Sequence, residues 1–236
     1  IIVGNTPGVL TDTTADFAFA LMLATARRVA EGDRIVRAGK WKTWGPMILL
    51  GPDVHGATLG IVGLGRIGSA IARRAKGFGM NLIYTDVIRN KQAEDEFGIK
   101  FVDMDTVLTQ SDFITLHTNL TQETFHLIGA KQFEKMKKTA ILINTSRGPI
   151  VDNMALYEAL KSGKIAYAGL DVTEPEPIPA NHPLLTLENV IVAPHIASAS
   201  VATRTKMGVM AADNLIAGLK GEMPPNPVNP EVLKKK

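Results

Sequence analysis

The stretch that decides the fold is TLGIVGLGRIG, residues 58–68, in which a short apolar run leads into three spaced glycines. Residues 58–63 are predicted to form a buried strand, and residues 67–76 a helix. A G-x-G-x-x-G pattern between a strand and a helix is typical of a turn that binds the pyrophosphate of a dinucleotide. Gly63 permits the tight turn, Gly65 lets the backbone approach the phosphates, and Gly68 lets the helix pack closely on the strand. The free N–H groups of the first helical turn then face the anion.

Strand and helix patterns alternate on both sides of this turn, from residue 58 to residue 193. The predicted strands are 58–63, 81–86, 100–102, 112–117, 139–145, 165–172 and 190–193. The predicted helices between them are 67–76, 91–97, 104–109, 131–137 and 153–162. This alternation predicts an α/β fold, a Rossmann-type doubly wound parallel sheet with helices on both faces. A helix is predicted over residues 11–31, and a connector, 39–57, leads from there toward the first strand. A last helix is predicted over residues 199–219, and an extended proline-rich tail follows it.

Composition excludes several classes of function. Of 236 residues, 45% are apolar and 21% are charged, as in ordinary globular proteins. The net charge is only +3, and the terminal run 234–236 supplies three lysines, which we expect to form a solvated end. We therefore expect no nucleic-acid partner, and the longest apolar run is too short to span a membrane. The absence of cysteine excludes disulfides and thiolate chemistry, and it is consistent with a cytoplasmic protein. We expect no metal site.

Asp86 ends the second predicted strand, about twenty residues after the last glycine of the turn. A carboxylate at this position accepts hydrogen bonds from the adenosine ribose and repels a 2′-phosphate. Asp86 therefore favours NAD(H) as the cofactor. Arg89 could instead meet such a phosphate, so NADP(H) is left open as an alternative.

Polar residues that follow later strands are candidates for catalysis. Arg147 follows the strand 139–145, where a guanidinium can bind an anionic ligand through charge-assisted hydrogen bonds. His195 and His117 each follow a strand, and an imidazole at either position is suited to act as a general acid. The residues themselves do not choose between these two histidines. His55, His126 and His182 are interpreted as loop or surface residues.

Three separated motifs carry a family resemblance: residues 144–149 (NTSRGP), residues 169–172 (GLDV) followed by 174–177 (EPEP), and residues 193–196 (APHI). They resemble the D-isomer-specific 2-hydroxyacid dehydrogenases, and the likeness covers nearly the whole chain. Residues 5–11 and 37–44 are similar to the glyoxylate/hydroxypyruvate reductase branch. The resemblance implies NAD(P)H-dependent reduction of glyoxylate or hydroxypyruvate to a D-2-hydroxy acid. The alternatives are a non-enzymatic NAD(H)-sensing module, as in related corepressors, or a family dehydrogenase for phosphoglycerate or formate.

The resemblance also implies roles for individual residues. It selects His195 over His117 as the proton donor and Glu176, rather than the neighbouring Glu174, as its carboxylate partner. Arg147 completes the implied catalytic set, as the residue that holds a 2-keto acid and polarises its keto oxygen. The implied cofactor contacts come from the glycine turn and from later strand ends: Gly63, Gly65, Arg66, Ile67, Gly68, Asp86, Thr118, Thr145 and Asp171.

The resemblance further implies a two-domain organisation. Residues 9–198 are expected to form the NAD-binding domain, including a linking helix and a dimerisation arm. Residues 1–8 and 199–236 are expected to belong to a substrate domain whose N-terminal portion is absent. Trp41 and Trp44 lie in the arm, and we expect a homodimer, with local packing of the two indoles as the alternative.

Overall fold

The computed structural model describes residues 1–233, so the lysine run 234–236 lies outside the described residues. The chain divides into two compact units. One contains Ala15–Ala197, and the other contains Ile1–Thr14 together with the chain from Ser198 onward. The assignment of the second unit to a substrate domain stays a prediction.

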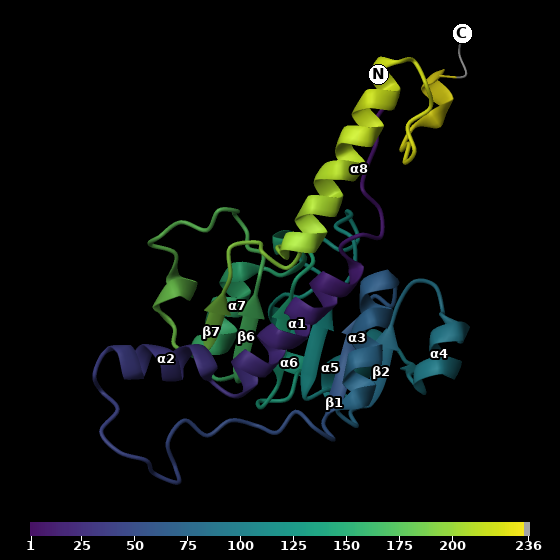
Figure 1. The fold of residues 1–236 in the computed structure, drawn as a ribbon. Coiled ribbons are helices and arrows are strands. Elements are labelled where there is room, and N and C mark those ends of the chain that lie inside the picture. Colours follow the sequence, from purple (N-terminus) through teal and green to yellow (C-terminus); the bar gives the residue numbers. More distant parts are fainter. Residues whose placement is uncertain (234–236) are drawn as a thin grey trace. The chain divides into compact units, whose positions relative to one another are not determined.

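The larger unit is built on a seven-stranded sheet in which every neighbouring pair of strands is parallel (Figure 1). The strands are β1 (Thr58–Val62), β2 (Asn81–Thr85), β3 (Lys100–Phe101), β4 (Phe113–Leu116), β5 (Ile141–Asn144), β6 (Tyr167–Leu170) and β7 (Val190–Val192). Their order in the sheet is β3-β2-β1-β4-β5-β6-β7. The predicted doubly wound Rossmann-type sheet is confirmed, with strands that are shorter than the predicted ranges.

Helices cover both faces of this sheet because the strands are apolar on both faces. Alternate residues of β5 show this directly: Ile141 and Ile143 pack in one hydrophobic cluster, and Leu142 packs in the other. The first cluster contains residues of α1 (Thr11–Ala26), α3 (Arg66–Gly77) and α4 (Lys91–Phe97). The second contains residues of α5 (Met104–Gln110), α6 (Ala130–Lys135) and α7 (Asn153–Lys161).

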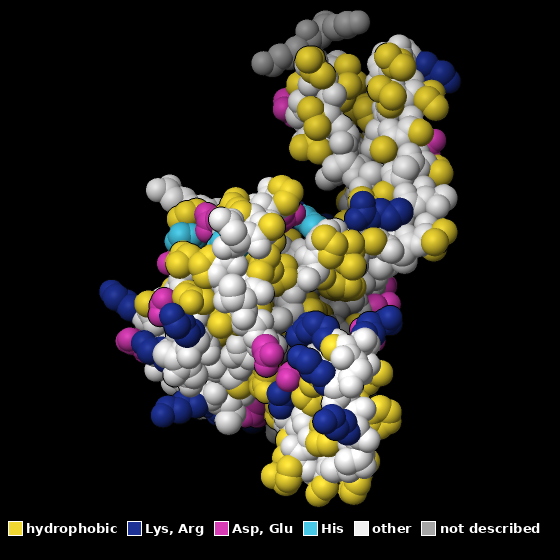
Figure 2. All heavy atoms as spheres, turned by 90° about the vertical axis from the view of Figure 1, so that its left-hand side faces the viewer, with side chains coloured by type: hydrophobic (Ala, Val, Ile, Leu, Met, Phe, Trp, Pro, Cys, Tyr) yellow, Lys and Arg dark blue, Asp and Glu magenta, His cyan; other side chains and the backbone are white. Residues whose placement is uncertain are grey.

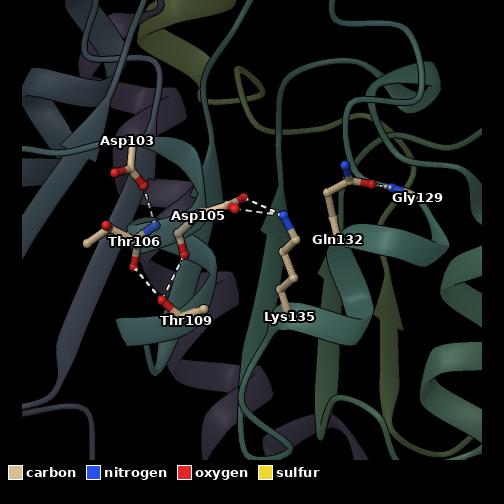
Figure 3. Close-up of polar contacts among 7 residues, drawn as sticks. All are labelled: Asp103, Asp105, Thr106, Thr109, Gly129, Gln132 and Lys135. Atoms are coloured by element: carbon tan, nitrogen blue, oxygen red, sulfur yellow. Dashed lines mark hydrogen bonds and ion pairs between the residues drawn. The ribbon is translucent and has the colours of Figure 1, made fainter.

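Short polar contacts set the ends of the helices on the second face (Figure 3). Asp103 caps α5, since its carboxylate accepts a hydrogen bond of 2.7 Å from the backbone N–H of Thr106. Lys135 of α6 donates to both carboxylate oxygens of Asp105, each at 2.7 Å, and so links α6 to α5. These contacts lie among exposed side chains and orient the helices that cover the sheet.

The helix predicted over residues 11–31 is wrong as a single element. It is two helices, α1 and α2 (Val29–Arg37), because Arg28 takes a left-handed backbone conformation with φ of 53°. The Arg28 guanidinium donates two hydrogen bonds to Glu31, at 2.8 and 2.7 Å, in the first turn of α2. No glycine or proline marks the break in the sequence.

The smaller unit contains α8 (Val201–Leu219), which Ser200 caps by accepting a hydrogen bond from Thr203 N–H. Asn214 of this helix donates to the carbonyl of Asn5 and accepts from the N–H of Asn226, at 2.8 and 3.0 Å. The tail lies beside the N-terminal segment, since Gly4 and Pro227 form an antiparallel bridge, and it is not extended throughout, since it contains a short 3₁₀ helix, η3 (Pro230–Leu233). Within residues 1–233, no helix is long and apolar enough to cross a bilayer.

Candidate active site

The candidate site lies at the carboxyl edge of the sheet, between β1 and β4. The chain runs outward from β1 to β2 and β3, and then returns to β4 on the other side of β1. Open α/β sheets bind ligands where the strand order reverses in this way. Gly63, which follows β1 with φ of 93°, directly abuts the loop after β4. A Cβ on Gly63 would come within 2.8 Å of the carbonyl carbon and oxygen of His117.

The glycine turn fits a dinucleotide. A Cβ on Gly68 would lie 2.2 Å from the carbonyl oxygen of Gly63, so this glycine is required by the packing of α3 on β1. A Cβ on Gly65 would meet no atom within 4 Å. Since the protein itself leaves that space open, the small residue at position 65 is explained by a ligand that approaches the backbone. Arg66 and Ile67 then begin α3, whose N-terminus suits an anion.

Two buried hydroxyls support the same assignment. Thr118 and Thr145 follow β4 and β5, and their Oγ1 atoms, like the hydroxyl oxygens of Thr25 and Ser111, are buried with no hydrogen-bond partner among residues 1–233. Buried polar atoms in folded proteins are nearly always paired, so the hydroxyls of Thr118 and Thr145, which follow strands at the carboxyl edge, have capacity for a ligand there. The resemblance had implied a cofactor contact at both positions.

Asp86 lies against the glycine turn. One of its carboxylate oxygens accepts a hydrogen bond of 2.6 Å from the backbone N–H of Leu64, and the other accepts one of 2.7 Å from Val87 N–H. The carboxylate is therefore fixed beside the turn, and each oxygen keeps a lone pair for a ribose hydroxyl.

His195 and Glu176 are within hydrogen-bonding distance, since Nδ1 of the imidazole lies 2.5 Å from Oε1 of the carboxylate. The two side chains are 49% and 40% exposed, so solvent and a small molecule can reach them. They line an open pocket of about 430 Å³, whose walls include Ile178, Leu185 and Val192. The pair presents a titratable group, oriented by a carboxylate, at the mouth of a partly apolar pocket.

Asp171 holds the loop that carries His195. Its buried carboxylate accepts hydrogen bonds from the backbone N–H groups of Ile196 and Ala197, at 2.8 and 2.7 Å, and its carbonyl accepts one from His195 N–H. Burial raises the pKa of Asp171, and the two N–H donors oppose that rise. These three bonds stabilise the left-handed backbone of His195, whose φ is 55°. The cofactor contact implied for Asp171 stays a prediction.

His117 differs from His195 in its surroundings. Burial lowers the pKa of His117 to about 4, and its Nε2 lies 2.9 Å from the Thr115 hydroxyl. The ring is therefore neutral near pH 7, and it has no carboxylate partner among residues 1–233. An imidazole that is neutral and has no carboxylate partner is a poor proton donor, so the surroundings of the two histidines favour His195 as the acid.

Glu174 and Glu176 have different partners. Glu174 contacts His126: Oε2 of the carboxylate lies 2.6 Å from Nε2 of the imidazole. His126 was interpreted as a loop or surface residue. Its partner lies 48 residues away, and no local pattern in the sequence indicates the pair. The backbone of Glu174 also accepts from Asn153, so these contacts brace the loop that leads to Glu176.

Arg147 follows β5 at the same edge, and it is exposed. Its Nη1 donates to the carbonyl of Ser146 at 2.6 Å, and no carboxylate among residues 1–233 pairs with the guanidinium. Asn144 accepts from Ser146 N–H and donates to the Arg147 carbonyl, which fixes the backbone of this turn. Arg147 makes no direct contact with His195 or Glu176, so its place in a shared catalytic set stays a prediction.

The glycine turn yields a paired prediction. Gly68→Ala should lower the free energy of unfolding by roughly 1–3 kcal/mol, because the added methyl group overlaps the Gly63 carbonyl. Gly65→Ala should leave the free energy of unfolding within about 0.5 kcal/mol of the native value but weaken NADH binding at least about tenfold. Urea unfolding and calorimetric titration measure the two effects. Unchanged NADH affinity in Gly65→Ala would contradict the assignment of the turn.

The environment of His117 predicts a pH-dependent contribution to stability. An unfolded histidine titrates near 6.5, above the folded value, so between these two pH values the unfolded chain binds the extra proton. The contribution is complete above about pH 6.5 and is lost as the pH falls toward 4. His117→Gln should therefore remove about 2 kcal/mol of the loss in stability measured by urea unfolding between pH 7 and pH 5. The exposed His55→Gln is the control, and equal pH slopes in all three proteins would refute the prediction.

Comparisons with known proteins agree with this geometry. Residues 19–197 match the family model described as D-isomer specific 2-hydroxyacid dehydrogenase, NAD binding domain. The chain is 63% identical over 235 residues to a glyoxylate reductase of Korarchaeum cryptofilum, covering 99% of this chain and 71% of that protein.

Solved structures show the same fold. A protein from Thermus thermophilus superposes with a TM-score of 0.92 at 49% identity, covering 97% of this chain and 71% of that one. D-lactate dehydrogenase with NAD⁺ from Lactobacillus jensenii superposes with a TM-score of 0.85 at 34% identity, covering 97% and 72%. With its glycine turn, its parallel sheet and these relatives, the chain belongs to the D-isomer specific 2-hydroxyacid dehydrogenase family and contains the family's NAD binding domain.

Proposed function

We propose that this chain reduces a small 2-keto acid, glyoxylate or hydroxypyruvate, to the D-2-hydroxy acid with NADH as the reductant. The single observation that carries the proposal is the His195–Glu176 pair at the carboxyl edge of the sheet, in the same unit as the open glycine turn. The relative from Korarchaeum cryptofilum is named a glyoxylate reductase, which supports this choice of substrate.

His195 is the proposed proton donor. Its Nδ1 faces Glu176, so Nε2 is left to give a proton to the keto oxygen as negative charge develops there. Glu176 fixes the tautomer and stabilises the imidazolium before transfer. Asp171 acts through the backbone by holding the loop of His195. The nicotinamide, when bound, supplies the hydride that reaches the keto carbon.

Arg147 is the proposed carboxylate-binding residue. A guanidinium that no carboxylate of residues 1–233 neutralises can bind the acid group of the substrate through charge-assisted hydrogen bonds. The same charge stabilises the alkoxide that forms at the keto oxygen. A substrate with both a carboxylate and an adjacent keto group uses Arg147 and His195 together.

The mechanism predicts that His195→Ala lowers kcat by roughly 10²–10⁴ with little change in the Kd for NADH, because the imidazole acts on the proton and not on the cofactor. Glu176→Gln should give a smaller loss. Turnover is followed by NADH absorbance with glyoxylate, hydroxypyruvate and pyruvate, with exposed His55→Ala as the control. Full activity in His195→Ala would remove it from the mechanism, and the absence of NADH oxidation with all three acids would count against the proposed function.

We further propose that the chain works as a homodimer through its arm, the connector of residues 39–57. Of the described residues of α2, none is buried. Beyond α2, Trp41, Met47 and Leu50 are exposed, and Trp44 is 77% exposed, so the two indoles are not packed locally. Hydrophobic side chains gather at the bottom of Figure 2, where Figure 1 places this arm. Apolar surface of this kind is typical of a protein interface.

A cytoplasmic location likewise stays a prediction.

The arm yields a test of the dimer. Trp44→Ser should shift the protein from dimer to monomer at micromolar concentration, because an aromatic residue at an interface often supplies much of the binding energy. Light scattering coupled to size exclusion measures the mass. Val87→Ser, an equally apolar-to-polar change at an exposed site outside the arm, should leave the mass unchanged. A monomeric native protein would refute the dimer.

A further inference from the structure

The loop after β2 contains one positively charged residue, Arg89, whose side chain contacts helix α4. Arg89 lies three positions after Asp86, and the next residue, Asn90, donates a hydrogen bond of 3.2 Å to the carbonyl of Leu64 in the glycine turn. The loop therefore folds back on the turn where a dinucleotide would place its ribose. The guanidinium of Arg89, however, donates to Glu94 of α4 through Nε and Nη2, at 2.7 and 2.8 Å.

Glu94 is itself firmly placed. Its Oε1 also accepts from the hydroxyl of Tyr84 at 2.8 Å, and that hydroxyl accepts from the backbone N–H of Asn90. Tyr84 is buried in the core, whereas Glu94 is 12% exposed and Arg89 is 51% exposed. The hydrogen bonds from Arg89 lower the pKa of Glu94 to about 2, with a further contribution from Tyr84, so Glu94 is ionised at all physiological pH values. The guanidinium of Arg89 also lies over the ring of Phe101, with the guanidinium carbon 5.8 Å from the ring centroid.

We propose that Glu94 is a specificity-determining residue: by holding the Arg89 guanidinium in a two-point ion pair, it withholds from NADP(H) the cation that would bind its 2′-phosphate. The inference rests on the proposed NAD(H) site. It assigns cofactor choice to two carboxylates, Asp86 at the ribose and Glu94 one loop away. With Arg89 neutralised, the loop presents the negative charge of Asp86, which repels a phosphate.

Other cations near the loop do not replace Arg89. Lys91 begins α4 as an exposed, strongly hydrated ammonium group, which attracts any phosphate weakly in high-dielectric solvent. Arg66 begins α3 at the glycine turn, where the pyrophosphate of either cofactor would lie. Both cations are present in every variant considered below, so their effect cancels when variants are compared.

The test is the ratio of Kd values for NADPH and NADH, measured by calorimetric titration of the whole chain. Glu94→Gln keeps an oxygen that accepts from Tyr84 but loses the charge that holds Arg89. The ratio should move toward NADPH by about fivefold, with the Kd for NADH within about twofold of native. Glu94→Asp, which keeps the charge, should retain more of the native preference than Glu94→Gln. Glu96→Gln removes another charge of the same helix and should leave the ratio unchanged.

Variants of Arg89 provide an independent test. In the native chain, Arg89→Ala should leave the Kd for NADPH within about twofold, because the guanidinium is already held by Glu94. In the Glu94→Gln background, the same change should abolish the gain in NADPH affinity. A Kd for NADPH that rises about tenfold in Arg89→Ala alone would show that Arg89 already binds the phosphate, and it would overturn the inference.

The outcomes separate this inference from the proposed function. Native chain that binds NADH while Glu94→Gln leaves the ratio unchanged, or weakens both cofactors equally, overturns the role of Glu94 alone. Native chain that binds neither cofactor overturns the proposed function and the inference with it. Far-UV circular dichroism confirms that each variant is folded, and the Arg89→Ala arm decides the matter if Glu94→Gln does not fold.

Discussion

Close contact between backbone segments at the glycine turn is the constraint on which the site depends. The chain after β1 passes so near the chain after β4 that a single methyl group at Gly63 would overlap the His117 carbonyl. A second methyl group, at Gly68, would push α3 away from β1. Because interiors are densely packed, neither contact can be relaxed without moving a strand or a helix. The turn is therefore held in one shape.

Carboxylates that accept backbone hydrogen bonds hold the loops around this turn. Asp86 binds the N–H groups of Leu64 and Val87, and Asp171 binds those of Ile196 and Ala197. Bonds from N–H groups to an ionised acceptor are shorter and stronger than neutral ones. Each aspartate follows one strand and fastens a loop that follows another, so the carboxyl edge is more rigid than the individual loops would be.

Histidines at this edge are distinguished by their partners. His195 faces Glu176 at a half-exposed position, His126 faces Glu174, and His117 is buried beside Thr115. A histidine can thus be a candidate proton donor, a residue that stabilises a loop, or a neutral residue buried in the interior. Its surroundings decide which, because burial disfavours the imidazolium of His117, whereas the rings of His126 and His195 each face a carboxylate.

Local patterns in the sequence were enough to predict the sheet, its parallel direction and the position of the glycine turn. Apolar runs, spaced glycines and strand–helix alternation are properties of neighbouring residues, and they are read directly from the chain. The same patterns place Arg147 and His195 at one edge of the sheet, since parallel strands end on the same side. Their catalytic roles came from the family resemblance and stay predictions.

Other features depend on contacts between residues far apart in the chain. The break at Arg28 has no glycine or proline to mark it, because the left-handed residue is stabilised by the Arg28–Glu31 pair in the next turn. Glu174 and Glu176 are two positions apart in the chain, but their histidine partners lie 48 and 19 residues away. By its position in the sequence alone Arg89 could bind a phosphate, whereas in the folded chain its guanidinium pairs with Glu94. Composition and spacing do not encode the direction in which a long polar side chain turns, because that direction is set by the charges and donors that folding brings beside it.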